Sequence, residues 1–379
     1  MTDYEAGLLQ FAGERRAPLL PHEVAARRPL LGTNERPAGL EELAGRRSVY
    51  IRSTAEAAQP AVEINAVDGQ DGLYRVDVPV DPDRPGALLG RTGERRSPQD
   101  YLAEISDDVD FRGHRPDWVD HLPVPRVLPE PTAALMERLD GRRLVRPFQT
   151  TRFPPEERQV FQDASWPWGL VGKLFNSNGL NGSAMLVGPR VVVTAGHMVP
   201  WGASNWWMRF VPAFFDGTSL HGTGVESYVS DYRGYDVGGD VCGYDWAVLR
   251  LYEPLGDWLG WFGFNGYDDD WEDDGYWTVV GYPGAIAGGQ RPSFQLGVSV
   301  FDDDSDSNGG QELETRADMG PGNSGGPMFG WWNDDPRILG DVSGEEYDSA
   351  LGGGEWGNVV AGGSGLSNLI SWARGAWPL

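Results

Sequence analysis

The stretch SAMLVGPRVVVTAGH, residues 183–197, holds two short apolar runs rich in valine on either side of a Gly-Pro-Arg turn at residues 188–190. Glycine and proline interrupt regular structure and valine favours strands, so the stretch predicts a β-hairpin. Working outward, DWAVLRL (245–251) alternates with period 2, and WTVVGYPG (277–284) and FQLGVSVF (294–301) are further predicted strands. Many short strands separated by glycine-rich turns predict an all-β sandwich or barrel.

The two ends of the chain differ in composition. Residues 1–160 carry 22 arginines and 27 acidic residues, a net charge of −5, whereas residues 161–379 carry 9 basic and 29 acidic residues, a net charge of −20. Fifteen of the 16 tryptophans also lie after residue 160. We therefore expect an N-terminal extension of mixed or irregular structure over residues 1–150, serving as a pro-region or a regulatory region, and an all-β domain over residues 151–379. Helical spacing in LSNLISWARGAW (366–377) predicts a C-terminal helix.

The bulk properties exclude several classes of protein. A net charge of −25 argues against nucleic-acid binding, because neutralising phosphates requires a basic surface. The sequence has no apolar run long enough to predict a membrane span. With Cys242 as the single cysteine, no intramolecular disulfide can form. The start lacks the basic-then-apolar layout of a secretory signal, so the compartment stays open. We expect a monomer that acts on protein or peptide substrates.

Backbone freedom is concentrated around one serine. The segment MGPGNSGGPM (319–328) contains four glycines and two prolines on either side of Ser324. A serine hydroxyl becomes a nucleophile only beside a general base, which a third group must orient. Of the two histidines in this half of the chain, His197 ends a predicted strand, whereas His221 lies in SLHGTG, a predicted surface turn. His197 is therefore the better candidate for the base.

An acid and an oxyanion site complete the constellation. Asp245 opens the predicted strand at 245–251 and can orient the base from a rigid edge. The backbone N–H groups of Gly322 and Ser324 can stabilise a tetrahedral oxyanion if the loop curls around the site. Taken singly, a serine in a glycine loop is a turn former, a histidine is a satisfied polar residue, and an aspartate before a strand is a cap. Together they predict a His-Asp-Ser triad.

From about Arg158 to its end, the chain resembles the trypsin-like serine proteases, and within them the bacterial glutamyl-endopeptidase or V8-like branch. The resemblance rests on TAGH (194–197), DWAVLRL (245–251) and GNSGGP (322–327). It implies two six-stranded antiparallel β-barrels with the site in the cleft between them. It also implies that His197 is the base, Asp245 orients it, Ser324 attacks the substrate, and Gly322 with Ser324 forms the oxyanion hole.

Departures from the family pattern concern the walls of the site. Many relatives carry two cysteines where this chain has Met198 and Ser183, so packing must hold that loop. Glutamate-cutting relatives use a histidine on the strand after the nucleophile, where this chain has Val342-Ser343-Gly344.

The resemblance places Asp318 and Ser343 at the substrate pocket, since Asp318 stands six residues before Ser324. An Asp318 facing the pocket favours arginine or lysine at the cut bond. An Asp318 satisfied by backbone N–H groups, or turned away, leaves specificity undetermined.

We expect no cofactor, with calcium as an alternative at one loop. DSDSNGGQE, which starts at Asp304, matches the first half of an EF-hand-like loop, with Asp304, Asp306 and Asn308 at alternate positions. The glutamate expected at the twelfth position is missing, because Thr315 stands there. A solvated acidic loop is the competing interpretation.

Three functions fit the sequence. The first is a serine endopeptidase made with a pro-region, cleaved within the arginine-rich segment at residues 141–152. The second is an intracellular regulatory protease controlled by its N-terminal region, and the third is a catalytically inactive protease fold used for binding. An inactive relative normally lacks a triad member, and none is lost here.

Overall fold

The computed structural model of the chain describes most of the residues after position 152 and several segments before it. The described residues are 13–44, 48–51, 62–66, 74–77, 110–130, 152–203, 206–348 and 355–377. The fold class is confirmed: the protein is mostly β, with few helices, one of them at the C-terminal end.

Six strands close into an antiparallel barrel, in which neighbouring strands follow the order β11-β12-β7-β6-β5-β8. The predicted hairpin lies in this barrel, where Met185 pairs with Val193 and Leu186 with Val192. The barrel strands are β5 (Val171–Asn176), β6 (Asn181–Leu186), β7 (Val191–Thr194), β8 (Met208–Pro212), β11 (Ser227–Gly234) and β12 (Ala247–Leu251).

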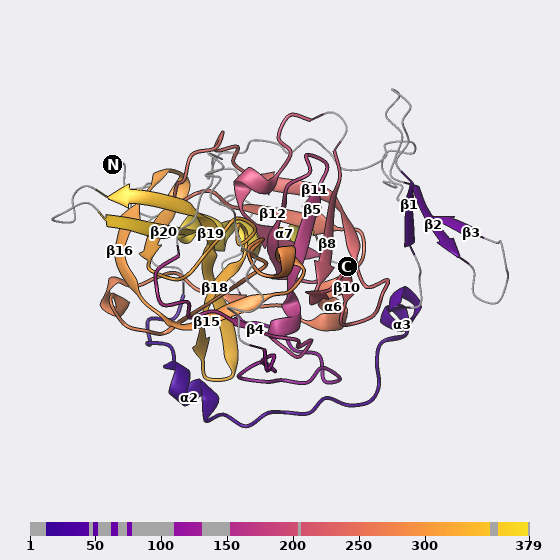
Figure 1. The fold of residues 1–379 in the computed structure, drawn as a ribbon, viewed down its shortest axis with the longest axis horizontal. Helices are drawn as coiled ribbons and strands as arrows, with labels where there is room; N and C mark the ends of the chain where they lie inside the picture. Colours follow the sequence, from indigo (N-terminus) through magenta and orange to yellow (C-terminus); the bar gives the residue numbers. More distant parts are fainter. Residues whose placement is uncertain are drawn as a thin grey trace.

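The second sheet follows the order β16-β17-β20-β19-β18-β14-β15-β4, and β13 pairs in parallel with β19. Figure 1 shows this sheet, orange to yellow apart from the magenta β4, beside the barrel strands in magenta to red. Its strands are β4 (Gln159–Val160), β13 (Gly263–Phe264), β14 (Trp277–Gly281), β15 (Ser293–Val298), β16 (Val300–Ser305), β17 (Gln311–Thr315), β18 (Pro327–Trp332), β19 (Asp335–Asp348) and β20 (Glu355–Gly362).

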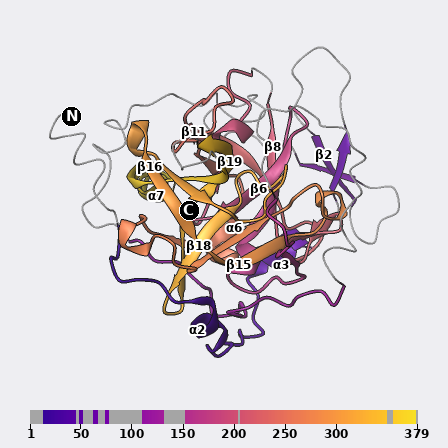
Figure 2. The same ribbon diagram turned by 60° about the vertical axis from the view of Figure 1, so that its left-hand side comes forward.

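The remaining elements are short. The predicted C-terminal helix is confirmed as α7 (Ser364–Ala376), which buries Leu366, Leu369 and Ile370. The others are α2 (Pro21–Ala25), α3 (Ala38–Ala44), α6 (Leu255–Leu259), β1 (Ser48–Ile51), β2 (Val62–Ala66), β3 (Tyr74–Asp77), β9 (Phe214–Phe215), β10 (Thr218–Ser219), η1 (Trp168–Leu170), η2 (Gly196–Met198), η3 (Asp269–Trp271), η4 (Ala287–Gly289) and η5 (Ser307–Gly309). Strands β1, β2 and β3 form a three-stranded antiparallel sheet of their own at one edge of the molecule (Figures 1 and 2).

The described parts of the N-terminal extension pack against the two sheets. Val24, Leu40, Leu43 and Val119 are buried in the same hydrophobic cluster as the barrel residues. The backbone N–H of Leu19 donates to the carbonyl of Trp331 (2.8 Å). These contacts join the extension to the all-β region, while the expected division at residue 150 stays a prediction.

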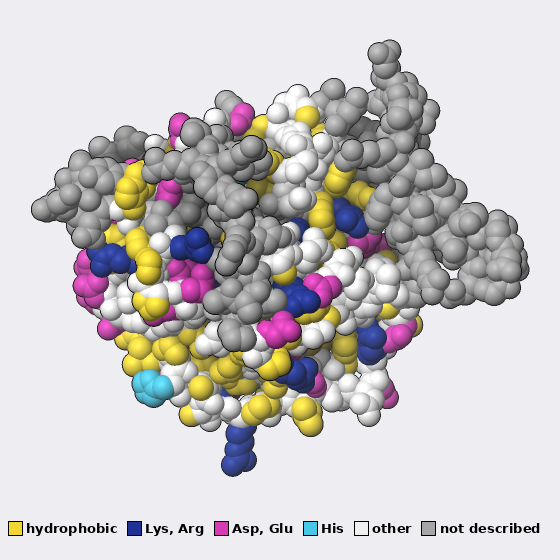
Figure 3. All heavy atoms as spheres, in the orientation of Figure 1, with side chains coloured by type: hydrophobic (Ala, Val, Ile, Leu, Met, Phe, Trp, Pro, Cys, Tyr) yellow, Lys and Arg dark blue, Asp and Glu magenta, His cyan; other side chains and the backbone are white. Residues whose placement is uncertain are grey.

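Tryptophans are prominent in the core. Trp168, Trp206, Trp246, Trp277 and Trp332 are each at most 2% exposed. The face drawn in Figure 3 intersperses acidic, basic and hydrophobic side chains. Among the described helices, none is long and apolar enough to cross a membrane.

Candidate active site

His197 and Asp245 are brought together by the pairing of two barrel strands. His197 lies in η2, three residues after the end of β7, and Asp245 lies two residues before β12. Strands β7 and β12 are antiparallel neighbours, with Thr194 opposite Ala247. The backbone N–H of His197 donates to Asp245 Oδ1 (2.8 Å), and His197 Nδ1 lies 2.7 Å from Asp245 Oδ2.

Asp245 fixes the tautomer of the imidazole. An ionised carboxylate only accepts hydrogen bonds, so its contact with Nδ1 places the proton on that nitrogen. The other ring nitrogen, Nε2, then presents a lone pair. Ser343 Oγ donates a further hydrogen bond to Asp245 Oδ2 (2.6 Å), and the Asp245 side chain is completely buried. The Asp245 carboxylate therefore binds His197 at two points, its backbone N–H and Nδ1, and Ser343 holds the carboxylate in place.

Ser324 sits in the loop between β17 and β18, which folds back toward the histidine. Gly325, the next residue, has φ +80°, and a Cβ on it would lie 2.2 Å from Thr194 Oγ1 and 2.9 Å from Ala195 N. Thr194 and Ala195 directly precede the loop of His197, so the absence of a side chain at Gly325 lets the two loops touch. Ser324 is 6% exposed and the His197 side chain 3% exposed.

Within residues 322–326, two N–H groups donate to no backbone carbonyl. Other N–H groups of this loop donate to carbonyls: Asn323 to Gly320 (2.9 Å), Gly325 to Val342 (2.8 Å) and Gly326 to Asn323 (2.7 Å). Within the described part of the chain, those of Gly322 and Ser324 donate to no backbone carbonyl. Gly322 has φ +104°, a conformation that favours glycine. These two groups are the pair expected to form the oxyanion hole.

Ser183 stands where many relatives of the resembled family carry a cysteine, and its hydrogen bonds connect the same loop. Its Oγ donates to the carbonyl of Gly322 (2.8 Å) and accepts from the backbone N–H of Tyr282 (2.9 Å). Its own N–H donates to the carbonyl of Ser324 (2.8 Å). Met198, at the second cysteine position, packs against Gly182, where a Cβ would lie 2.8 Å from the Met198 methyl carbon. Hydrogen bonds and packing thus hold the loop that a disulfide staples in many relatives.

Asp318 is 2% exposed, and backbone N–H groups occupy its carboxylate. Oδ1 accepts from the N–H of Phe153 (2.7 Å) and Oδ2 from that of Glu157 (2.9 Å). Its own N–H donates to Gln295 Oε1 (2.6 Å). Burial raises the pKa of Asp318, and the two backbone N–H groups oppose that rise. This geometry corresponds to the alternative in which the acid is satisfied by the backbone, so its part in substrate binding stays a prediction, as does that of Ser343.

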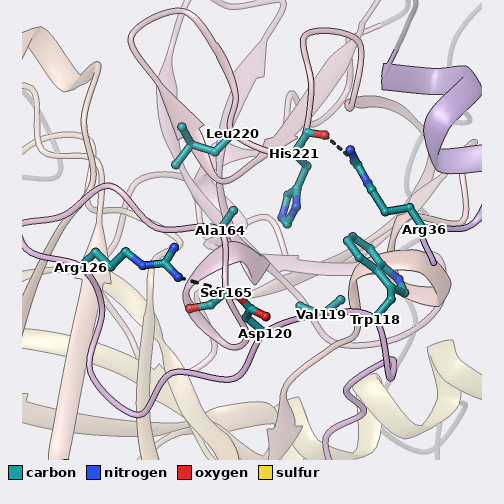
Figure 4. A pocket seen from close by; sticks show the side chains of 9 residues that line it. All are labelled: Arg36, Trp118, Val119, Asp120, Arg126, Ala164, Ser165, Leu220 and His221. Carbon is teal, nitrogen blue, oxygen red and sulfur yellow. Dashed lines mark hydrogen bonds and ion pairs between the residues drawn. The ribbon is translucent and has the colours of Figure 1, made fainter. Parts of the chain in front are cut away.

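The surface-turn prediction for His221 was wrong. His221 is 8% exposed, its carbonyl accepts from Arg36 Nη2 (2.7 Å), and burial lowers its pKa to about 4. It lines a pocket between the extension and the barrel, where Figure 4 shows the imidazole pointing in from one side and Arg126 from another. The extension covers this turn. The polar residues around His221 predicted exposure because the local sequence carries no sign of that cover.

In the candidate calcium loop, one acidic side chain already accepts hydrogen bonds from backbone N–H groups. Asp306 caps η5 by accepting from the N–H of Ser307 and also accepts from the N–H of Gly243 (3.0 Å). Asn308 has φ +62°, in the turn itself, while Asp304 belongs to β16. Across the described residues, no group of three or more His, Cys, Asp or Glu side chains is placed to hold a metal ion. Calcium binding at this loop stays untested.

Comparison with known proteins agrees with this architecture. Residues 182–340 match the family model described as the trypsin-like peptidase domain. No curated protein matches the chain. Similar solved structures, each 20% identical in sequence, include a Glu endopeptidase in complex with MPD (TM-score 0.46, covering 59% of this chain and 100% of its own). They also include the protease Anisep from Arthrobacter nicotinovorans (0.39, 57% and 99%) and the thermostable serine protease AL20 from an extremophilic microorganism (0.40, 55% and 98%). Residues 182–340 are therefore similar to the trypsin-like peptidase domain, the family that the sequence motifs resemble.

Proposed function

We propose that the protein is a serine endopeptidase of the V8-like branch, with Ser324 as nucleophile, His197 as general base and Asp245 as the group that orients it. The observation that carries the proposal is the contact of Asp245 with both the backbone N–H and Nδ1 of His197. With the proton on Nδ1, Nε2 is the ring nitrogen that can take a proton, and it lies on the loop that touches the loop of Ser324.

The proposed reaction has two halves. Ser324 Oγ attacks the scissile carbonyl while His197 Nε2 takes its proton, and the oxyanion accepts from the N–H groups of Gly322 and Ser324. Collapse breaks the C–N bond, and His197 returns the proton to the leaving amine. Water then attacks the acyl-enzyme ester with His197 as base, which releases the carboxylic acid and restores Ser324.

Two substitutions test the assignment. Ser324→Ala and His197→Ala should each lower kcat about 10⁴-fold or more, because each removes a member of a unit that acts as a whole. Both variants should unfold at the temperature of the parent, and an active-site serine probe should label the parent but not Ser324→Ala. Near-normal peptide hydrolysis by either variant would refute the triad and favour the interpretation as a binding protein.

Specificity is proposed to arise elsewhere than at Asp318. Two backbone N–H groups already stabilise the buried Asp318 carboxylate, so it gains less from a cationic substrate side chain than an unpaired acid would. Peptides with Arg, Lys, Glu, Leu or Phe at the cut position should be compared on the parent and on Asp318→Asn. We expect the ratio of kcat/KM for Arg over Leu to change by less than about threefold. A larger fall in that ratio would reinstate Asp318 as the pocket acid.

Maturation is proposed to occur after Arg152. Arg152 is exposed at the end of the arginine-rich segment, and its neighbour Phe153 already points its N–H at Asp318. Cleavage of this bond would turn that amide into an α-ammonium group, which would pair with the carboxylate in place. The low exposure of His197 and Ser324 in the intact chain supports a precursor whose site must open.

A controlled cleavage tests this. A site for a sequence-specific protease, ending at position 152, would release Phe153 as a new N-terminus in the full chain. The nicked protein should be more active than the intact one, and Asp318→Asn should remove the gain. A matched protein cut one residue earlier, so that Arg152 is the new N-terminus, should gain less because its ammonium group lies one residue further from Asp318. Equal activity of the intact and nicked chains would contradict the proposal.

A further inference from the structure

Asp341 is a buried carboxyl group for which the mechanism above has no use. Its residue is 0% exposed, and neither carboxyl oxygen has a hydrogen-bond partner in the described part of the chain. It lies in β19, opposite Pro327 of β18 and Ala361 of β20, neither of which has a polar side chain. A charged carboxylate in such a place would be unpaired and dry, so the neutral form is favoured.

The position of Asp341 relates it to the candidate site. It stands two residues before Ser343 in β19, where the pairing with β20 is irregular between Val342 and Gly344. Ser343 Oγ donates to Asp245 Oδ2, so Asp245 lies beside this part of the strand. Asp245 is the described titratable group that acts electrostatically on Asp341, and its carboxylate also contacts His197. Burial raises the pKa of Asp341 well above its usual range, and the charge of Asp245 raises it further.

We propose that Asp341 is a positioning residue of this site, held as a neutral carboxyl group near Asp245 so that the negative charge facing His197 resides on Asp245 alone. The inference rests on the proposed function, because it concerns the same His197–Asp245 pair. Ionisation of Asp341 would set a second negative charge against Asp245, and their repulsion would disturb the carboxylate that orients the imidazole. We therefore expect peptide hydrolysis to fall at alkaline pH, where Asp341 ionises.

Stability against pH tests the neutral state without any need for activity. In the unfolded chain an aspartate loses its proton near pH 4, whereas folded Asp341 keeps it. Folding then takes up one proton, so the stability contributed by Asp341 falls as pH rises from about 4 to its folded pKa. In a Ser324→Ala background, we expect the folding equilibrium constant to fall about tenfold per pH unit relative to that of the same chain with Asp341→Asn. Parallel pH dependences would overturn the proposal.

Activity and the state of the histidine test the positioning role. Asp341→Asn replaces the acid by a neutral group of the same shape, so kcat/KM at pH 7 should stay within about threefold of the parent. Its alkaline loss should begin at higher pH than in the parent. The pKa of His197, followed by NMR, should be unchanged, whereas removal of an ionised Asp341 would lower it by about one unit or more. A lowered His197 pKa, or an alkaline limb identical to the parent's, would overturn the role.

Asp163 supplies the matched control. It is as buried as Asp341, but its two oxygens accept from the N–H groups of Arg126 and Ser165 (both 2.8 Å). Asp163→Asn should lower stability and leave the alkaline limb of activity unchanged. If every variant, the parent included, fails to cut peptides, the proposed function fails. The stability slope and the His197 titration would still decide whether Asp341 is neutral in the folded protein.

Discussion

At the scale of single residues, Ser183 shows how one hydroxyl can replace a covalent staple. It joins three segments that carry the site: its own strand β6, the turn at Tyr282 and the loop of Ser324. Each of its hydrogen bonds is modest alone, but removing the hydroxyl leaves two buried backbone groups unpaired. The penalty for those unpaired groups is what should be measurable.

Ser183→Ala should therefore lower the free energy of unfolding by about 1–3 kcal/mol and reduce kcat by about tenfold or more, because the loop of Ser324 loses an anchor. Denaturant unfolding and peptide hydrolysis measure the two effects. Ser177 is the matched control: its hydroxyl is buried but without a partner among the described residues, so Ser177→Ala should be neutral. Equal behaviour of the two variants would show that Ser183 is no anchor.

At the scale of elements, the contact between the loops of His197 and Ser324 depends on glycine. Gly325 and Gly202 share a positive φ, +80° and +72°, yet they differ in surroundings. A Cβ at Gly325 would lie 2.3 Å from the carbonyl oxygen of Ser183, whereas nothing lies within 4 Å of one at Gly202. Comparing alanine substitutions at Gly325 and Gly202 therefore separates the free-energy cost of a positive φ from the cost of pushing the two loops apart.

Gly202→Ala should lose about 1–2 kcal/mol of stability, the cost of the left-handed conformation, and keep its activity. Gly325→Ala pays that cost and also pushes the two loops apart, so kcat should fall at least about 100-fold. Thermal unfolding and steady-state kinetics on both variants measure the difference. Comparable kinetics in the two would mean that the loops can separate without harm.

The elements also show where sequence interpretation succeeds. The hairpin at β6–β7, the strand β12 and the helix α7 follow from local periodicity and turn residues, which need no tertiary context. The contact of Ser343 with Asp245 does not, because the two residues lie almost 100 positions apart and meet only through the folding of the sheets. The triad was predicted from residue types and from the motifs that carry the family resemblance, and the roles of its members stay a prediction.

At the scale of the whole molecule, the extension behaves in the structure as part of the same packed body. Helix α3 lies against α6, because a Cβ at Gly39 would be 2.7 Å from the Trp258 ring. Arg36 binds the carbonyl of His221 in the barrel. None of this was visible in the sequence, because helices of five to seven residues carry too little periodicity to reveal a buried face. The composition border near residue 160 reflects surface and tryptophan content more than packing.

Leu40→Ala tests whether the extension stabilises the all-β region. Leu40 is 0% exposed and belongs to the hydrophobic cluster of the barrel, so its truncation should cost about 2–5 kcal/mol. Tryptophan fluorescence is a suitable probe, because 15 of the 16 tryptophans lie after residue 160 and report that region. Leu31 is the matched control at 80% exposed, and Leu31→Ala should stay within about 0.5 kcal/mol of the parent. If the two variants unfold alike, the extension contributes no stability to the all-β region, and cleavage after Arg152 should release it. If only Leu40→Ala is destabilised, the cleaved extension should remain bound until those core contacts open.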